Sequence, residues 1–257
     1  MKAKLRRGDV VIGALNNLQA PALIELLGLV ALDYVIIDAE HTAITAESAE
    51  GLYRAAELRH LPAITRVGEN SPQVVQKFMD AGSMGIMMPM VTTPAEVQHV
   101  VDAVKYPPLG KRGLAASRAS NWYLTASPAD YVRLANEETF VAIQIETREA
   151  IDNFDALVDH DQVDAVFFGP SDISAALGVH GQLRHPDVVR IIERLGRKAI
   201  ARGKVAGTLA LELEDYTRYR AMGFLWFATV IHQLVLRGVR GYLQELHAHE
   251  RGREPAK

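Results

Sequence analysis

The chain contains no cysteine among its 257 residues. This absence excludes disulfides, thiolate nucleophiles, iron–sulfur clusters and zinc sites with cysteine ligands. It also fits a reducing compartment, where proteins fold without disulfides. Any catalytic chemistry must therefore come from other side chains.

The chain also lacks a strong excess of either charge, with 28 Lys and Arg against 31 Asp and Glu, a net charge of −3. Proteins that bind nucleic acid or anionic membranes by electrostatics carry a clear basic surplus. We therefore expect neither a nucleic-acid nor a membrane partner, and any anion must be recognised by a few local cations.

Long apolar runs are missing as well. The basic segment 1–10 is followed by Asn16, Asn17 and Gln19, where a signal peptide needs apolar residues. The apolar segment 22–32 is interrupted by Glu25 and is shorter than the ~20 residues that span a bilayer. These features predict a soluble, cytoplasmic protein.

Short Val- and Ile-rich runs do recur along the chain, each followed by a segment with helical spacing of apolar residues. Such alternation is typical of βαβ units, and runs without polar alternation indicate parallel strands buried on both faces. The expected strands cover 10–14, 34–38, 63–67, 85–91, 140–145, 165–168, 205–209 and 225–230. The expected helices lie near 20–30, 45–59, 71–81, 94–104, 128–136, 148–158, 187–202, 211–222 and 233–247.

Eight strand signals within one domain length predict a closed α/β barrel, the (β/α)₈ fold, with a doubly wound open sheet as the weaker alternative. No Gly-x-Gly-x-x-Gly motif opens a helix, which disfavours a dinucleotide-binding fold. We expect one domain over 1–247 and a polar tail over 248–257. A long connection at 105–127 is typical of a lid or binding loop.

Polar residues gather where the apolar strands end, and in this fold catalytic residues lie at the carboxyl ends of strands. Glu146 and Asp172 follow adjacent strands, so their carboxylates can converge on one ion. Two carboxylates without a thiol form a hard oxygen site that suits Mg²⁺ or Mn²⁺. The alternative is that each residue only caps a helix, because acidic residues favour helix N-termini.

Three more residues at strand ends are candidates. Gln144 shares a strand face with Glu146 and can hold a water on the metal or a substrate oxygen, although a buried amide is also often structural. Arg66 offers a planar fork for a carboxylate, or forms a salt bridge to an acid at a strand end. His41 follows two acids that can orient its ring for acid–base chemistry, although an isolated histidine is more often structural.

Other catalytic classes find little support. No Gly-x-Ser-x-Gly elbow supports a hydrolase nucleophile, and no lysine ends a strand as a Schiff-base mechanism requires. What remains is a metal, an arginine, a histidine and acids. This set suits polarisation of a 2-keto acid, so that a C–C bond forms or breaks next to the stabilised enolate.

At these residues the sequence resembles the HpcH/HpaI aldolase family, whose members cleave 2-keto-4-hydroxy acids to pyruvate and an aldehyde. The resemblance spans nearly the whole chain. Its marks, weak singly and specific as an ordered set, are Ile37-Asp38-Ala39-Glu40-His41, Arg66-Val67, Met88-Pro89-Met90-Val91, the segment 105–113, Gln144-Ile145-Glu146-Thr147 and Gly169-Pro170-Ser171-Asp172-Ile173-Ser174.

The resemblance implies a (β/α)₈ barrel of the phosphoenolpyruvate/pyruvate-binding type. It also implies a homo-oligomer, commonly a hexamer that exchanges the last helix between neighbouring subunits. The implied small-molecule substrates are pyruvate or oxaloacetate with an aldehyde, and the implied cofactor is a divalent metal, Mg²⁺, Mn²⁺ or Co²⁺.

The resemblance also assigns roles to residues. Glu146 and Asp172 would hold the metal, and Gln144 a water on it or a substrate oxygen. Arg66 would bind the pyruvate enolate. The remaining implied roles are acid–base catalysis by His41 paired with Asp80, and binding of the pyruvate carboxylate by backbone amides around Gly169 and Ser171.

Two segments depart from the family pattern. The Gly-Val-Asp usual after the last strand is replaced by Val230-Ile231-His232, and the segment 206–209 matches loosely. These changes leave the metal and pyruvate end intact and affect the aldehyde end. There we expect the loop residue Arg118 to meet a second carboxylate.

The leading interpretation is therefore a metal-dependent class II aldolase. One alternative is a condensing enzyme, similar to citrate synthase, that joins oxaloacetate to an acetyl thioester on the same barrel. A second alternative is a barrel that binds a keto acid without turnover, which the acid–base candidates disfavour.

Overall fold

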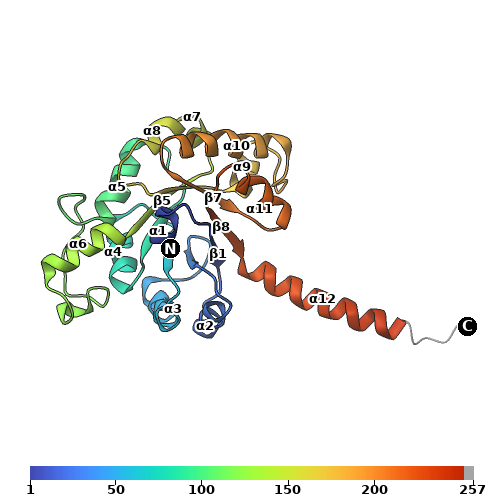
Figure 1. The fold of residues 1–257 in the computed structure, drawn as a ribbon, viewed down its shortest axis with the longest axis horizontal. Helices are drawn as coiled ribbons and strands as arrows, with labels where there is room; N and C mark the ends of the chain where they lie inside the picture. The colour runs from blue at the N-terminus through green and yellow to red at the C-terminus, as the bar shows by residue number, and fades with distance from the viewer. Residues whose placement is uncertain (252–257) are drawn as a thin grey trace, which may run out of the picture.

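Eight parallel strands close into a barrel in chain order in the computed structural model, which describes residues 1–251. The sheet closes because the first strand pairs with both the second and the last, for example through Val11 and Trp226. The predicted (β/α)₈ barrel is thus confirmed and the open sheet is excluded (Figure 1). The strands are β1 (Val11–Asn16), β2 (Tyr34–Ala39), β3 (Ala63–Val67), β4 (Gly85–Met88), β5 (Phe140–Ile145), β6 (Ala165–Phe168), β7 (Val205–Leu209) and β8 (Trp226–Val230).

Most strand boundaries follow from the apolar runs. β3 and β5 are buried at every position and match the predicted ranges, as expected for parallel strands covered on both faces. β4 is shorter than predicted because Pro89, which follows it, has no N–H to continue the ladder. Met90 then takes a φ of 56°, which turns the chain away from the sheet.

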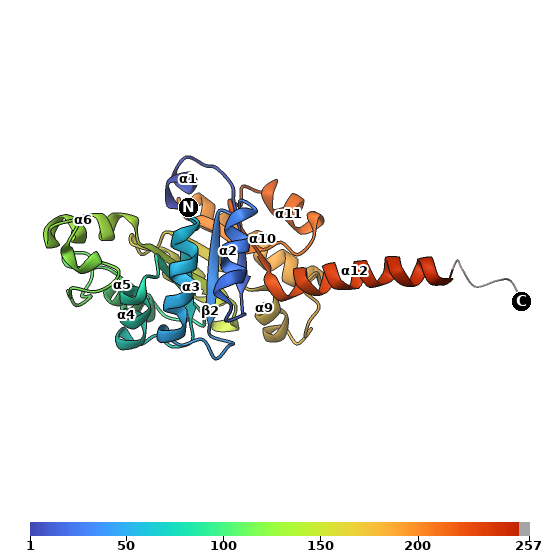
Figure 2. The same ribbon diagram turned by 90° about the horizontal axis from the view of Figure 1, so that it is seen from below.

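Helices surround the barrel and return the chain from the carboxyl end of one strand to the amino end of the next (Figures 1 and 2). Local signals start several of them, such as the capping boxes of Thr45 and Thr93. They are α1 (Lys2–Arg6), α2 (Pro21–Leu29), α3 (Ala46–Leu58), α4 (Pro72–Ala81), α5 (Pro94–Val104), α6 (Pro128–Glu138), α7 (Arg148–Asp152), α8 (Phe154–Val158), α9 (Pro170–Ala176), α10 (Pro186–Ala201), α11 (Leu213–Arg220) and α12 (Ile231–Arg251), with a 3₁₀ turn, η1 (Asn121–Tyr123).

A few helices differ from the prediction. The single helix expected at 148–158 is divided into α7 and α8 at Asn153, whose φ and ψ of −88° and 7° interrupt the regular hydrogen bonding. Two short helices, α1 and α9, are additional, because neither is long enough to show an apolar periodicity.

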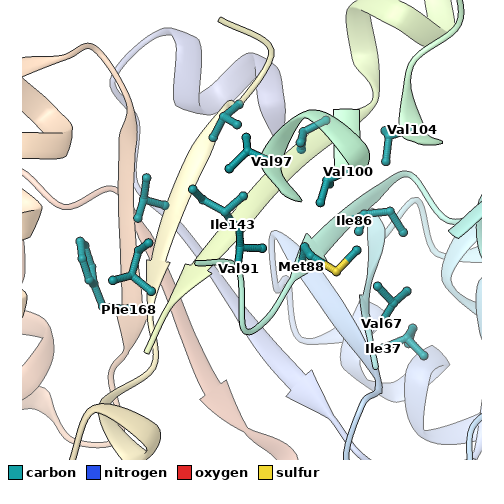
Figure 3. Packing of buried hydrophobic residues seen from close by; sticks show 14 of the residues in the cluster. Ile37, Val67, Ile86, Met88, Val91, Val97, Val100, Val104, Ile143 and Phe168 are labelled. Carbon is teal, nitrogen blue, oxygen red and sulfur yellow. The ribbon is translucent and has the colours of Figure 1, made fainter. Parts of the chain in front are cut away.

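Apolar residues form two cores on either side of the sheet. The outer core lies between the strands and the helices, where α5 packs Val97, Val100 and Val104 over Ile86 and Ile143 (Figure 3). The inner core fills the barrel and centres on Trp226. Its indole ring lies 5.2 Å from the Phe140 ring and 4.9 Å from the Phe167 ring, centroid to centroid.

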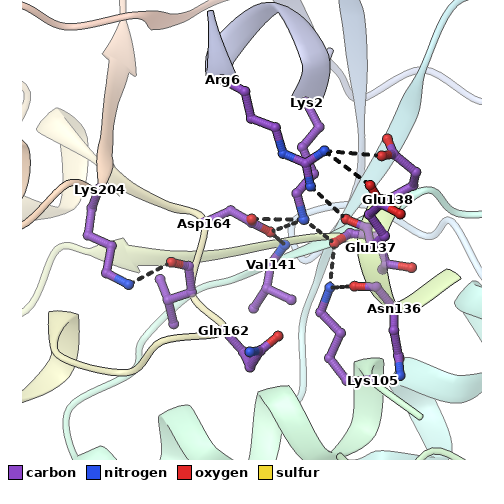
Figure 4. Close-up of polar contacts among 12 residues, drawn as sticks. Lys2, Arg6, Lys105, Asn136, Glu137, Glu138, Val141, Gln162, Asp164 and Lys204 are labelled. Carbon is purple, nitrogen blue, oxygen red and sulfur yellow. Dashed lines mark hydrogen bonds and ion pairs between the residues drawn. The ribbon is translucent and has the colours of Figure 1, made fainter. Parts of the chain in front are cut away.

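The amino end of the barrel is closed by ionic and polar contacts (Figure 4). Lys2 of α1 lies 2.8 Å from Asp164, measured from Nζ to Oδ1. Lys105 is buried and donates through Nζ to the carbonyls of Asn136 (2.7 Å) and Thr139 (2.8 Å). Burial lowers the pKa of Lys105 to about 8.

The last helix, α12, projects away from the barrel (Figures 1 and 2). It continues through Arg251, so the first part of the predicted tail at 248–257 is helical, and the remainder, 252–257, lies outside the described residues. No helix among residues 1–251 has both the length and the apolar character needed to cross a membrane.

The two tryptophans provide a test of the inner core. Trp226 is fully buried, whereas Trp122 is 55% exposed. We expect Trp226→Ala to lower the free energy of unfolding by about 3–5 kcal/mol, because it leaves a cavity among aromatic rings. Trp122→Ala should change it by less than about 0.5 kcal/mol. Urea denaturation followed by circular dichroism measures both, and similar effects of the two substitutions would contradict this description of the core.

Candidate active site

A cavity of about 410 Å³ opens at the carboxyl end of the barrel. Its polar lining comes from residues that follow different strands, as in other (β/α)₈ enzymes. They include Asn17, Asp38, His41, Arg66, Gln144, Ser171, Asp172 and His232, and the apolar lining includes Leu15, Met87, Phe167, Leu209, Leu211 and Val230.

Arg66 is held at the end of β3 by Asp38 on the neighbouring strand. Its Nε donates to Asp38 Oδ1 (2.9 Å) and its Nη2 to Asp38 Oδ2 (2.8 Å). The two residues are register partners of adjacent parallel strands, so the side chains meet directly. The salt bridge that the sequence analysis left open therefore exists. Nη1 has no hydrogen-bond partner within residues 1–251, which leaves one side of the guanidinium free.

Glu40 connects Arg66 to His41. Glu40 Oε2 lies 3.2 Å from Arg66 Nε and 3.5 Å from His41 Nε2. The first contact is an ion pair rather than a hydrogen bond, because the Nε–H already points to Asp38. Burial raises the pKa of Glu40, although Arg66 and His41 oppose this rise. The His41 side chain is 61% exposed, so its ring can exchange protons with solvent.

Glu146 is buried next to this cavity, with 2% of its surface exposed. Its Oε1 accepts a hydrogen bond from the Met90 amide (2.9 Å), and its Oε2 contacts Gln144 Nε2. Burial raises the pKa of Glu146 to about 7, and the negative charges of Asp172 and Glu40 add to the rise. The carboxylate is thus partly protonated near neutral pH unless a cation joins it.

Gly169, which follows β6, leaves the space that this arrangement needs. A Cβ at Gly169 would lie 2.7 Å from Glu146 Oε2 and 2.9 Å from Gln144 Nε2. The Gly169 amide donates to the Ile145 carbonyl (3.3 Å), so it is not free for the predicted substrate carboxylate. Ser171 lies in the first turn of α9 and lines the cavity, and its amide has no intrahelical acceptor.

The donor set fits a divalent metal. Glu146 and Asp172 are close enough for the charge of Asp172 to raise the pKa of Glu146. Gln144 Oε1 is buried, and no donor within residues 1–251 reaches it. No group of three or more His, Asp or Glu residues gathers around one point in the described part of the chain. Two carboxylates and an amide oxygen match a hard cation that keeps positions open for substrate.

Two predicted residues lie elsewhere. Asp80 lies in the last turn of α4 and pairs with Arg112 (Oδ1 to Nη2, 2.6 Å). Because α4 returns the chain to the amino end of the barrel, Asp80 lies far from His41, which follows β2. The expected contact of His41 with Asp80 therefore does not form within one chain.

Arg118 also lies away from the cavity. Its Nη1 donates to Glu57 Oε1 (3.1 Å) and to the Ala81 carbonyl (2.9 Å), both near the ends of helices. The loop 105–127 follows α5 and so begins at the amino end of the barrel, whereas the cavity lies at the opposite end. Within one chain, Arg118 therefore does not face the aldehyde end of the cavity, because the loop follows a helix rather than a strand.

The sequence analysis did not assign three residues that line the cavity or contact its side chains. Asp38 and Glu40 were noted at the end of the second strand, but their contacts with Arg66 were not assigned. Asn17 was considered only as a polar residue near the N-terminus, and the structure places it in the cavity next to His232. Its position directly after β1 was the available signal, since β1 was expected to end at residue 14.

The fold and the cavity are those of a barrel enzyme whose chemistry lies at the carboxyl ends of its strands. The sequence matches the model of the HpcH/HpaI aldolase/citrate lyase family over residues 12–234, and the chain belongs to this family. It is an aldolase of this family, similar to a 5-keto-4-deoxy-D-glucarate aldolase of Shigella dysenteriae serotype 1 (strain Sd197). The two are 34% identical over 227 residues, covering 88% of each chain.

Solved structures agree with this assignment. The HpcH/HpaI aldolase from Desulfitobacterium hafniense DCB-2 is 30% identical, with a TM-score of 0.87 over 94% of this chain and 96% of that one. The citrate synthase SbnG is 29% identical, with a TM-score of 0.88 over 99% of both chains. The same barrel thus also occurs in a protein named as a condensing enzyme.

The raised pKa of Glu146 predicts a pH-dependent stability. A carboxyl with a folded-state pKa of about 7 and an ordinary value of 4.5 stabilises the fold below pH 4.5 and loses that contribution as the pH rises through 7. We expect metal-free protein to lose about 2–3 kcal/mol of unfolding free energy between pH 5 and 8, relative to Glu146→Gln. Chemical denaturation in a chelator measures the difference, and identical pH profiles of the two proteins would contradict the assignment.

Proposed function

We propose that this aldolase depends on a divalent metal and reversibly cleaves a 2-keto-4-hydroxy acid to pyruvate and an aldehyde. The observation that carries the proposal is the buried carboxylate of Glu146, beside the cavity that Arg66 lines. This carboxylate contacts Gln144, and the negative charge of Asp172 raises its pKa. Glu146 and Asp172 are the residues that would hold Mg²⁺, Mn²⁺ or Co²⁺. Such an ion, when bound, polarises the keto acid and stabilises its enolate.

The other residues of the cavity suit the keto-acid end of the substrate. Arg66 can donate from Nη1 to the oxygen that gains charge, because Asp38 holds the rest of the guanidinium in place. The side-chain amide of Gln144 can accept a hydrogen bond from, or donate one to, the keto-acid end of the substrate. The free amide of Ser171 can receive the keto-acid carboxylate, as amides at the first turn of a helix do.

His41 is positioned for the proton transfer. In cleavage, the C4 hydroxyl loses its proton as the C3–C4 bond breaks, and C3 keeps the electron pair and is then protonated to give pyruvate. His41 lines the cavity and contacts Glu40, so it can take the hydroxyl proton through a water and return it in the reverse direction. Glu40 acts here as the positioning residue.

We further propose that the chain works as a homo-oligomer, with a hexamer as the expected form. The helix α12 projects away from the barrel (Figure 2). Apolar side chains are exposed along it, which supports contact with another copy. Asp80 can reach His41 only from a second copy, because the two lie at opposite ends of one barrel. The exposed apolar residues of α12 are Leu234, Val235, Leu236, Val239, Tyr242, Leu243 and Leu246.

The cysteine-free composition supports a cytoplasmic location, where a reducing environment leaves disulfides without use. The cavity takes a small molecule, and its volume of about 410 Å³ accommodates a keto acid together with an aldehyde.

Exchange of the pyruvate methyl protons in D₂O tests the proposal. We expect exchange with Mg²⁺ or Mn²⁺, because enolate formation precedes C–C bond formation, and none after chelation. Glu146→Gln and Asp172→Asn should each reduce exchange by about 100-fold, since each removes a metal ligand. The matched control Glu149→Gln, on the exposed first turn of α7, should exchange like the wild type.

Absence of exchange with any divalent metal would contradict the proposed function. Turnover of oxaloacetate with an acetyl thioester, without aldol formation from any aldehyde, would instead favour the condensing reaction.

A further inference from the structure

Asn17 and His232 form a hydrogen-bonded pair in the wall of the cavity. Asn17 follows β1 and His232 lies in the first turn of α12, directly after β8. Since β1 and β8 are neighbouring strands, the two side chains meet, and Asn17 Nδ2 lies 2.7 Å from His232 Nδ1. Both residues line the cavity that also contains Arg66 and Gln144.

This pair faces the metal end from the opposite side of the barrel. In a closed barrel of eight strands in chain order, β1 and β8 lie across from β4 and β5. Gln144 and Glu146, at the end of β5, would hold the keto-acid end of the substrate. The other end, which becomes the aldehyde, then extends toward Asn17 and His232.

The pair has unused hydrogen-bonding capacity. Asn17 Oδ1 is buried, and no donor within residues 1–251 reaches it. With Nδ1 of His232 accepting from the amide, the neutral ring carries its proton on Nε2. Rotation of the amide by 180° exchanges the roles of the two residues. In both neutral arrangements the pair therefore keeps one free acceptor and at least one free N–H donor.

We propose that Asn17 and His232 recognise a hydroxyl group on the aldehyde part of the substrate. A hydroxyl both donates and accepts, so it can pair with the free acceptor and with a free N–H donor. The preferred aldehydes are then those with a hydroxyl next to the carbonyl, and the preferred keto acids carry hydroxyls at C4 and C5. This inference rests on the proposed function and assigns the two residues that contact the aldehyde end of its substrate.

Other aldehyde classes match this wall less well. A second carboxylate on the substrate would need a cation near Asn17 and His232. Arg66 is the only Lys or Arg among the described lining residues, and it lies on another wall of the cavity, where it is paired with Asp38. An alkyl aldehyde would leave Asn17 Oδ1 buried and unpaired, which costs binding energy. The surrounding residues Leu15, Leu209 and Val230 are apolar, and Gln233, next to His232 in the chain, is a further polar residue of the lining.

The test compares glycolaldehyde with propionaldehyde as acceptors for pyruvate, since the two have equal numbers of heavy atoms and differ by a hydroxyl in place of a methyl. The ratio of their kcat/KM values is measured in the wild type and in Asn17→Ala and His232→Leu. We expect each substitution to lower the ratio by about 10-fold, through loss of glycolaldehyde turnover. The double variant should lose little more, because the two residues act as one pair.

Each substitution can be tested without the other, so a folding defect in one leaves the test intact. The control His99→Ala, on the exposed side of α5, should keep the wild-type ratio. The inference fails if the folded variants keep the wild-type ratio, or if they lose turnover of glyoxylate more than of glycolaldehyde. Wild-type exchange of pyruvate protons separates these outcomes from failure of the proposed function, since a protein without exchange or aldol formation overturns both.

Discussion

The site depends on negative charge gathered at one end of the barrel and only partly balanced there. Parallel strands direct all their carboxyl ends to the same rim, and the residues that follow them include Asp38, Glu40, Glu146 and Asp172. Arg66 is the cation that faces them. Asp38 accepts most of the hydrogen bonds that Arg66 can donate, so the remaining carboxylates repel one another. Burial and this repulsion raise the pKa of Glu146 to about 7. A divalent cation is the simplest partner for such a group.

The two ends of the barrel serve different purposes. At the amino end, aromatic packing around Trp226 and the contacts of Lys105 close the interior. At the carboxyl end, Gln144 Oε1 and Asn17 Oδ1 remain buried without partners in the described residues. Unsatisfied polar atoms cost stability, so the presence of these two at the cavity indicates groups that can bind a ligand. The two lie on opposite sides of the barrel, which suits a substrate that spans the cavity.

The barrel could be predicted from the sequence because the signals for its strands and helices are local. Apolar runs such as 63–67 and 140–145 mark buried parallel strands, and the residues after them mark the rim, which is how Arg66, Gln144 and Glu146 were found. Contacts between strands were harder, because they depend on register. The pairing of Asp38 with Arg66 follows from the register of β2 and β3, which composition does not reveal. The fold explains why Asp80 and Arg118 lie at the closed end of their own barrel, since Asp80 is near the end of a returning helix and Arg118 contacts residues near the ends of two such helices.

The most direct test of the central claim is the location of a bound metal. Crystals of the full chain grown with Mn²⁺ and pyruvate should show an anomalous-scattering peak between the carboxylates of Glu146 and Asp172, with oxygen ligands at about 2.2 Å. The account predicts that pyruvate occupies the open positions of this ion and faces Arg66. An ion bound elsewhere in the barrel, with the Glu146 and Asp172 oxygens pointing apart, would contradict it.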